Sequence, residues 1–263
     1  MDGLSLHYYV HPEGWEIKGS ATDFDDKVWY KSLNKALFME TLIERHGHIM
    51  DEYDPEKKIG MIVDEWGAWY TVEPGTNPGF LYQQNTMRDA LIAGITLNIF
   101  NKHSDRISMA NIAQVVNVLQ AMVLTEGDQI VKTPTYDVFA MYKEHQGASL
   151  VQSAVDTLPV DYDGKVIPSL SESVSVSDDR NMTITLANTS LKEEIQVICR
   201  LEDKSQFNGQ AEIAVLQDEV HAHNTFEQPD QVKVQYRTEH WNGSEQTVTL
   251  LPCSVCRIHC PIV

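Results

Sequence analysis

The sequence predicts a protein of two parts, an α/β part over residues 1–149 and an all-β part over residues 150–263. From Leu4 to Gln146, short apolar runs alternate with helical stretches, which is typical of βα units that build a parallel sheet. From about Leu150, apolar and polar residues alternate in short runs between turn residues, which is typical of an antiparallel sandwich. A chain of 263 residues admits one large domain or two medium ones, and this change of pattern favours two.

Three βα units are predicted in the first part. The expected strands are residues 4–9, 58–64 and 107–118, the last with its following turn. The expected helices are residues 29–53, residues 82–100 and a third helix that opens at Thr133-Pro134. Residues 58–64 form a near-continuous apolar run, as a strand covered on both faces requires. Three parallel strands alone leave an edge open on each side of the sheet, so this part looks incomplete.

The second part contains six runs with strand-like alternation. They are residues 173–176, 182–186, 195–199, 212–216, 232–236 and 247–250. Turn residues are expected to separate them at 178–181, 208–209 and 242–243.

Charge and composition exclude several classes of function. Thirty-eight acidic against 20 basic residues give a net charge of −18, which disfavours nucleic acid and anionic membrane surfaces as partners and leaves neutral ligands such as sugars open. No window is apolar enough for a membrane span, and no export signal follows Met1. The compartment stays open between cytoplasmic and exported, because the natural N-terminus is expected to be missing.

Polar side chains follow each of the three predicted strands of the α/β part. Residues 63–70 (VDEWGAWY) place Asp64 and Glu65 beside three aromatic residues, which suits the apolar faces of sugar rings, although either carboxylate could simply cap a loop. His7 and Tyr9 end the first strand and point to one side. Gln114 and Asn117 follow the third strand and could bind sugar hydroxyls or hold a loop.

These segments resemble the α-L-arabinofuranosidases of glycoside hydrolase family 51, and the resemblance runs over essentially the whole chain. The most specific match is the strand end at residues 63–70. The other matching segments are residues 3–9, 89–94, 113–118, 223–226 and 230–232.

The resemblance implies a (β/α)8 TIM barrel, represented here by its strands six to eight, followed by a C-terminal β-sandwich. It also implies a retaining glycosidase that uses two glutamates. Glu65 matches the nucleophile, and Tyr9 matches a tyrosine near it, with His7 as its neighbour. Gln114 matches a glutamine that contacts the arabinofuranosyl hydroxyls, and Trp69 matches an aromatic residue of the sugar-binding cleft.

The acid/base glutamate of the family has no counterpart in this chain, because barrel strands one to five are missing from the pattern. Asp64, Glu73 and Glu126 do not match that role. We therefore expect negligible hydrolysis by the chain alone. The resemblance implies no metal and no organic cofactor. The expected ligand is an arabinofuranosyl-containing oligo- or polysaccharide, and a homo-oligomer is possible.

Two alternatives to an enzyme half remain open. The chain could be an inactive truncated product that serves as a sugar-binding or structural module. A separate polypeptide could also supply the first five strands.

The cysteine-rich end of the chain invites a metal interpretation. Cys253, Cys256, His259 and Cys260 include a C-x2-C spacing, but all four fall in a single expected last strand, whereas structural zinc sites draw ligands from two separated clusters. We expect a cysteine-rich strand and no metal site.

Overall fold

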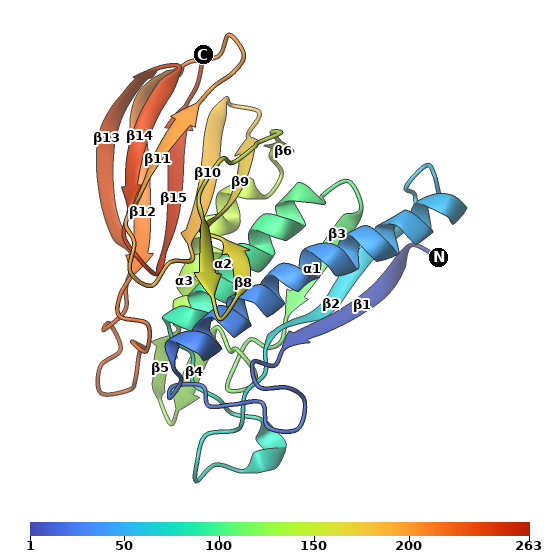
Figure 1. The fold of residues 1–263 in the computed structure, drawn as a ribbon, viewed down its shortest axis with the longest axis vertical. Helices are drawn as coiled ribbons and strands as arrows, with labels where there is room; N and C mark the ends of the chain where they lie inside the picture. Colours follow the sequence, from blue (N-terminus) through green and yellow to red (C-terminus); the bar gives the residue numbers. More distant parts are fainter.

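The computed structural model describes residues 1–263 and has three layers, a parallel sheet, a layer of helices and a β-sandwich (Figure 1). The parallel sheet has the order β1-β2-β3. Its strands are β1 (Gly3–Val10), β2 (Gly60–Ala68) and β3 (Ile107–Ile112). The helices are α1 (Asp26–Tyr53), α2 (Met87–Lys102) and α3 (Pro134–Tyr142). None of them is both long and apolar enough to cross a bilayer.

The three predicted helices are present, and their first residues are fixed by capping side chains. Asp25 accepts a hydrogen bond from the first turn of α1, and Thr133 does the same before Pro134 in α3. The prediction for the second helix was wrong at its start, because α2 begins at Met87. Thr86 and Asp89 form a capping box there, and Gln83 binds the backbone of Ala68 and Tyr70 in an extended segment.

The predicted parallel strands are present with different lengths. β2 runs four residues beyond Asp64, and β3 stops at Ile112, so residues 113–118 form a loop. The sequence analysis did not predict two hairpins and two short 3-10 helices. They are β4 (Val123–Glu126) with β5 (Gln129–Lys132), β7 (Pro159–Tyr162) with β8 (Lys165–Pro168), η1 (Pro78–Phe80) and η2 (Lys143–His145).

The second part is mostly sheet, as predicted. A six-stranded sheet has the order β13-β12-β15-β10-β9-β6, and a two-stranded ribbon, β11-β14, covers one of its faces. The strands are β6 (Ser149–Leu150), β9 (Leu170–Val176), β10 (Asn181–Asn188), β11 (Ile195–Arg200), β12 (Phe207–Gln217), β13 (Gln235–Gly243), β14 (Glu245–Leu250) and β15 (Ser254–Pro261).

Two predictions about the sandwich were wrong. Asn208-Gly209 is no turn, because both residues lie inside β12 and pair with Asn242 and Trp241 of β13. The run at 232–236 enters a strand only at Gln235, since the backbone N–H of Val232 donates to Asn224 Oδ1 in the preceding loop. The turn expected at 178–181 does separate β9 from β10.

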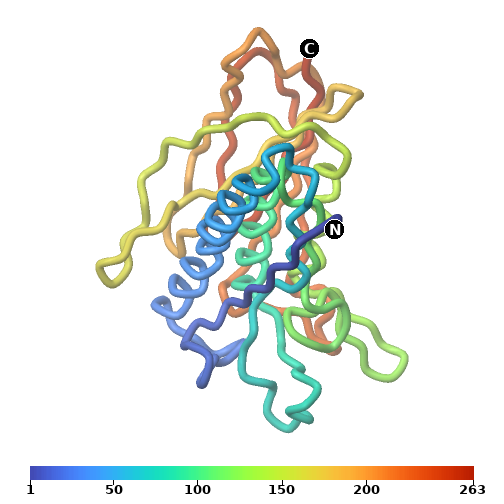
Figure 2. The backbone as a smooth tube through the Cα atoms, turned by 90° about the vertical axis from the view of Figure 1, so that its right-hand side faces the viewer, coloured from blue at the N-terminus to red at the C-terminus, as the bar shows by residue number.

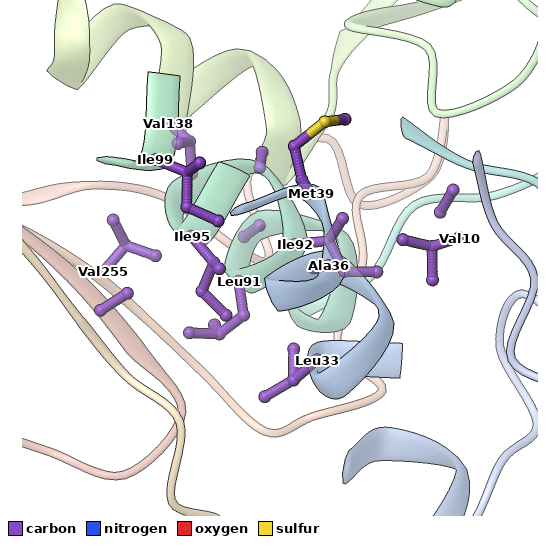
Figure 3. Close-up of a cluster of buried hydrophobic side chains, with 14 of the residues drawn as sticks. Val10, Leu33, Ala36, Met39, Leu91, Ile92, Ile95, Ile99, Val138 and Val255 are labelled. Atoms are coloured by element: carbon purple, nitrogen blue, oxygen red, sulfur yellow. The ribbon is translucent and has the colours of Figure 1, made fainter. Parts of the chain in front are cut away.

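Helix α2 lies at the centre of the molecule and is buried on nearly all sides. It packs against α1, against β2 and against strands β9, β10 and β15 of the sandwich (Figures 1 and 2). One hydrophobic core therefore runs from Val10 and Leu33 through Ile92 to Val255 (Figure 3). The predicted boundary at residues 149 and 150 falls just where β6 begins, but the two parts share this core across it.

A buried polar network joins α2 to the sandwich. Asn98 Oδ1 of α2 accepts hydrogen bonds from Ser173 and Thr185 at 3.0 and 2.8 Å. His145 continues the network, with Nε2 3.0 Å from Thr185 Oγ1 and Nδ1 2.7 Å from Ser175 Oγ. Burial, followed by the nearby charge of His259, lowers the pKa of His145 to about 4. His145 is therefore neutral in the folded state at neutral pH.

We predict that His145 makes folding acid-sensitive. The pKa of His145 is lower in the folded state than in the unfolded chain. Its contribution to the free energy of unfolding is therefore complete above about pH 6.5 and is lost as the pH falls toward 4. The loss by pH 5 should be on the order of 2 kcal/mol. Urea unfolding at pH 7.5 and pH 5 measures it. His145→Gln should remove this part of the pH dependence, and an unchanged dependence in that variant would contradict the assignment.

Candidate active site

A β-bulge in β2 sets the direction of the residues at the strand end. Leu6 pairs with Val63 but His7 pairs with Glu65, so β2 carries one extra residue at this point. The pairing with β3 skips in the same place, between Val63 and Trp66. An extra residue reverses the alternation of side chains along the strand. Trp66 therefore faces the helices and is buried beside Phe100 and Phe139, while Glu65 faces away from them.

Glu65, Tyr9 and His7 come together on this free face of the sheet. The Tyr9 hydroxyl donates a hydrogen bond of 2.8 Å to Glu65 Oε2, and His7 Nδ1 lies 3.6 Å from the same oxygen. The side chains of His7 and Glu65 are 49% and 47% exposed, so a ligand can reach the carboxylate. Burial, and then the hydrogen bond and charge of Glu65, raise the pKa of Tyr9 well above its ordinary value. Tyr9 therefore keeps its proton and donates a hydrogen bond to Glu65.

Trp69 adds an aromatic wall to the cluster. Its ring lies 5.3 Å from the ring of Tyr9 in an edge-to-face arrangement. Its backbone N–H donates to the Val10 carbonyl, which ties the end of β2 to the end of β1. Four of the five predicted site residues are therefore joined through direct contacts.

The backbone behind the carboxylate is held by a buried glutamine that the sequence analysis did not single out. Gln120 Oε1 accepts the Ala68 N–H at 2.6 Å, and its Nε2 donates to the Asp89 carbonyl at 3.0 Å. Gly67, at φ +138°, permits this approach, since a Cβ there would lie 3.0 Å from Gln120 Oε1. This bridge connects the end of β2 to the first turn of α2.

Gln114, the fifth predicted site residue, lies at the same end of the sheet without joining the cluster. The residue before it, Ala113, donates its backbone N–H to the Trp66 carbonyl. Gln114 itself is exposed, and its side chain makes no hydrogen bond to Glu65 or Tyr9. Asn117 holds a loop, because its amide exchanges hydrogen bonds with Thr125 at 2.8 and 2.9 Å. The loop-holding alternative for Asn117 agrees with this geometry.

The terminal cysteines do not converge on one point. Cys253 precedes β15 and packs in the core shared with the helices, whereas Cys256 and Cys260 pack between the six-stranded sheet and the ribbon. All are free thiols, and burial raises the pKa of Cys256 to about 12. No group of three or more His, Cys, Asp or Glu side chains is arranged to hold a metal ion.

We predict that Glu65→Gln lowers the pKa of Tyr9. The substitution removes the carboxylate charge that disfavours tyrosinate, while the burial of the ring remains. NMR of ring-labelled tyrosine, with Tyr9→Phe to assign the signal, should show Tyr9 ionising at lower pH in Glu65→Gln than in the unsubstituted chain. Glu73→Gln is the matched control and should leave Tyr9 unchanged. Identical Tyr9 titrations in all three proteins would refute the coupling.

Comparison with known proteins gives consistent matches. Residues 64–254 match the family described as the alpha-L-arabinofuranosidase C-terminal domain. An intracellular exo-alpha-L-arabinofuranosidase of Bacteroides ovatus is 43% identical over 242 residues, which are 89% of this chain and 45% of that protein. The chain therefore spans about half the length of this curated relative.

Solved structures agree with this match. The GH51 arabinofuranosidase from Xanthomonas axonopodis pv. citri superimposes with a TM-score of 0.94 at 40% identity, covering 99% of this chain and 53% of that one. An α-L-arabinofuranosidase from Thermotoga maritima, solved as an arabinose complex, shares the fold with a TM-score of 0.78 at 22% identity, covering 98% and 52%. The chain belongs to the α-L-arabinofuranosidases of glycoside hydrolase family 51 and corresponds to their C-terminal portion.

Proposed function

We propose that this chain carries the nucleophile half of a retaining exo-α-L-arabinofuranosidase, with Glu65 as the nucleophile. The observation that carries the proposal is the 2.8 Å hydrogen bond from Tyr9 to a half-exposed Glu65 at the C-terminal ends of two parallel strands. The family membership and the activity named for the Bacteroides ovatus relative support the same reaction. The substrates would be terminal arabinofuranosyl residues of arabinan- or arabinoxylan-type saccharides.

In the proposed reaction, Glu65 attacks the anomeric carbon of the arabinofuranosyl ring and forms a covalent ester as the glycosidic bond breaks. Tyr9 binds one carboxylate oxygen and so aims the other at the sugar. His7 lies beside the same carboxylate, and Trp69 offers an aromatic wall for the ring. Gln114 would reach the sugar hydroxyls from the end of β3, which its exposed position allows.

The leaving oxygen must receive a proton from a second carboxyl group, about 5 to 5.5 Å from the first in retaining enzymes. Tyr9 and His7 are the side chains that form a hydrogen bond or an ion pair with Glu65, and no second carboxylate of the chain matches the family's acid/base. Glu73 binds the Gln84 N–H in its own loop. We therefore assign the acid/base to residues outside this chain and identify β1, β2 and β3 with strands six to eight of a (β/α)8 barrel. The open edges of β1 and β3 support this assignment.

The same lack of a second carboxylate favours one alternative, a chain that binds sugars without hydrolysing them. The two proposals differ in whether Glu65 turns over substrate once the rest of a barrel is supplied.

We predict that the chain alone hydrolyses an aryl arabinofuranoside negligibly. A hybrid protein that joins it to the N-terminal half of the Bacteroides ovatus relative should regain hydrolysis, because that half would supply the acid/base. Glu65→Gln in the hybrid should reduce turnover to background, and small anions such as azide should restore part of the activity of Glu65→Gly.

Glu73→Gln is the control and should keep the hybrid active, since Glu73 accepts a hydrogen bond from the Gln84 N–H in its own loop and forms none with Tyr9. A folded hybrid whose turnover survives Glu65→Gln would rule out the nucleophile assignment. A hybrid that binds arabinose but hydrolyses nothing would favour the sugar-binding alternative.

A further inference from the structure

We propose that Trp15 and Lys18 form a second sugar-binding position, outside the Glu65 cluster, that receives the saccharide on the leaving-group side of the cleaved bond. The inference rests on the proposed function and adds where the remainder of the substrate lies. Both residues belong to the loop of residues 11–25 that connects β1 to α1. This loop and the loop after β2 extend from the same end of the parallel sheet (Figures 1 and 2).

The aromatic surface is continuous from the catalytic cluster to Trp15. The Trp69 ring, which touches Tyr9, also lies 5.5 Å from the Trp15 ring in an edge-to-face arrangement. His11 fills the angle between the two tryptophans, with ring centroids 5.2 and 5.6 Å away. Trp15 is thus two ring-to-ring steps from the tyrosine that holds Glu65. A saccharide seated at Glu65 can reach it by extending along this surface.

Trp15 is held in place although it is 64% exposed. The loop that carries it is tied down on both sides. Its contacts are Lys31 to Glu13, Lys35 to the His11 carbonyl, Thr71 to the Ile17 and Gly19 carbonyls, and Arg88 to the Ser20 and Ala21 carbonyls. An exposed indole on a fixed loop presents a rigid apolar surface without an ordering cost on binding, which is typical of a binding position.

Lys18 supplies the polar part of this position. Its ammonium lies 4.8 Å from the Trp15 ring centre and 5.4 Å from that of Trp69, and it donates to the Trp15 carbonyl at 2.8 Å. In a chain with a net charge of −18, Lys18 pairs with no carboxylate, so its other N–H donors remain available. A sugar has an apolar face for the indole and hydroxyl oxygens that accept from the ammonium.

The direction of the saccharide follows from exo action. An exo-acting enzyme closes its site around the terminal sugar, so further residues of the substrate can lie only on the leaving-group side. Trp15, as the outermost ring of the surface, then contacts the saccharide that departs, and the arabinofuranosyl ring itself contacts Tyr9 and Trp69.

Tryptophan fluorescence is well suited to test this. Trp29, Trp66 and Trp241 are at most 1% exposed, so a change caused by a sugar reports on Trp15 and Trp69. The full chain is titrated with arabinose and with two trisaccharides, arabinotriose and arabinofuranosyl-xylobiose, and the affinities are checked by ligand-observed NMR. We expect at least one trisaccharide to bind more tightly than arabinose and to change the Trp15 signal, which Trp15→Phe identifies.

Trp15→Ala should weaken the binding of that trisaccharide about five- to tenfold and leave arabinose binding unchanged. Lys18→Met, which keeps the apolar stem, should have a smaller effect of the same kind. Trp69→Ala should weaken both sugars. Tyr53→Ala, an exposed aromatic residue at the last turn of α1, is the control and should change neither.

The outcomes separate this inference from the proposed function. If arabinose binds and Trp69→Ala weakens it, but Trp15→Ala and Lys18→Met bind both trisaccharides as the unsubstituted chain does, the second position is refuted and the proposed function stands. If neither arabinose nor a trisaccharide binds the unsubstituted chain, the second position is refuted, and the proposed function is decided separately by Glu65→Gln in the hybrid protein.

Discussion

The extra residue in β2 is the constraint on which the site depends. Without it, the alternation that buries Val63 would turn Trp66 toward the free face of the sheet and Glu65 into the helix layer. With the bulge, the Trp66 side chain, the largest apolar one of the strand, enters the core, and the Glu65 carboxylate remains accessible on the other face. Burial of Trp66 therefore stabilises the same backbone conformation that presents Glu65 to Tyr9.

The sequence predicted which side chains lie together at the strand ends better than it predicted where the helices and strands begin and end. The residues of the cluster were identifiable because His7, Tyr9 and Glu65 follow strand-like runs, and strand ends share one edge of a parallel sheet. The bulge could not be foreseen, since one extra residue leaves no mark in a short apolar run. The start of α2 was misplaced for a related reason. The helix was predicted to begin at Tyr82, but Gln83 binds the backbone of Ala68 and Tyr70 instead.

Side-chain contacts between residues far apart in the sequence could not be predicted either. The loop after β1 was identified only as a connection, yet it is held by Arg88 of α2, whose guanidinium lies 3.8 Å from the Phe24 ring centre and 4.1 Å from that of Tyr70. Nothing local to residues 11–25 reveals a partner more than sixty positions away. The error at Asn208-Gly209 was of the opposite kind, because a strong local turn signal was overridden by strand pairing of these residues with Asn242 and Trp241 of β13.

The sandwich packs closely against the α/β part that carries the site. Its loop before β13 reaches back to the α/β part, where Asn224 donates to the Lys132 carbonyl and His221 contacts both the backbone and the ring of Phe24. Phe24 in turn stacks on the Arg88 that holds the loop of Trp15. The family match from residue 64 to residue 254 crosses both parts in the same way. One core and one chain of contacts therefore join the sandwich to the strand ends that carry Glu65.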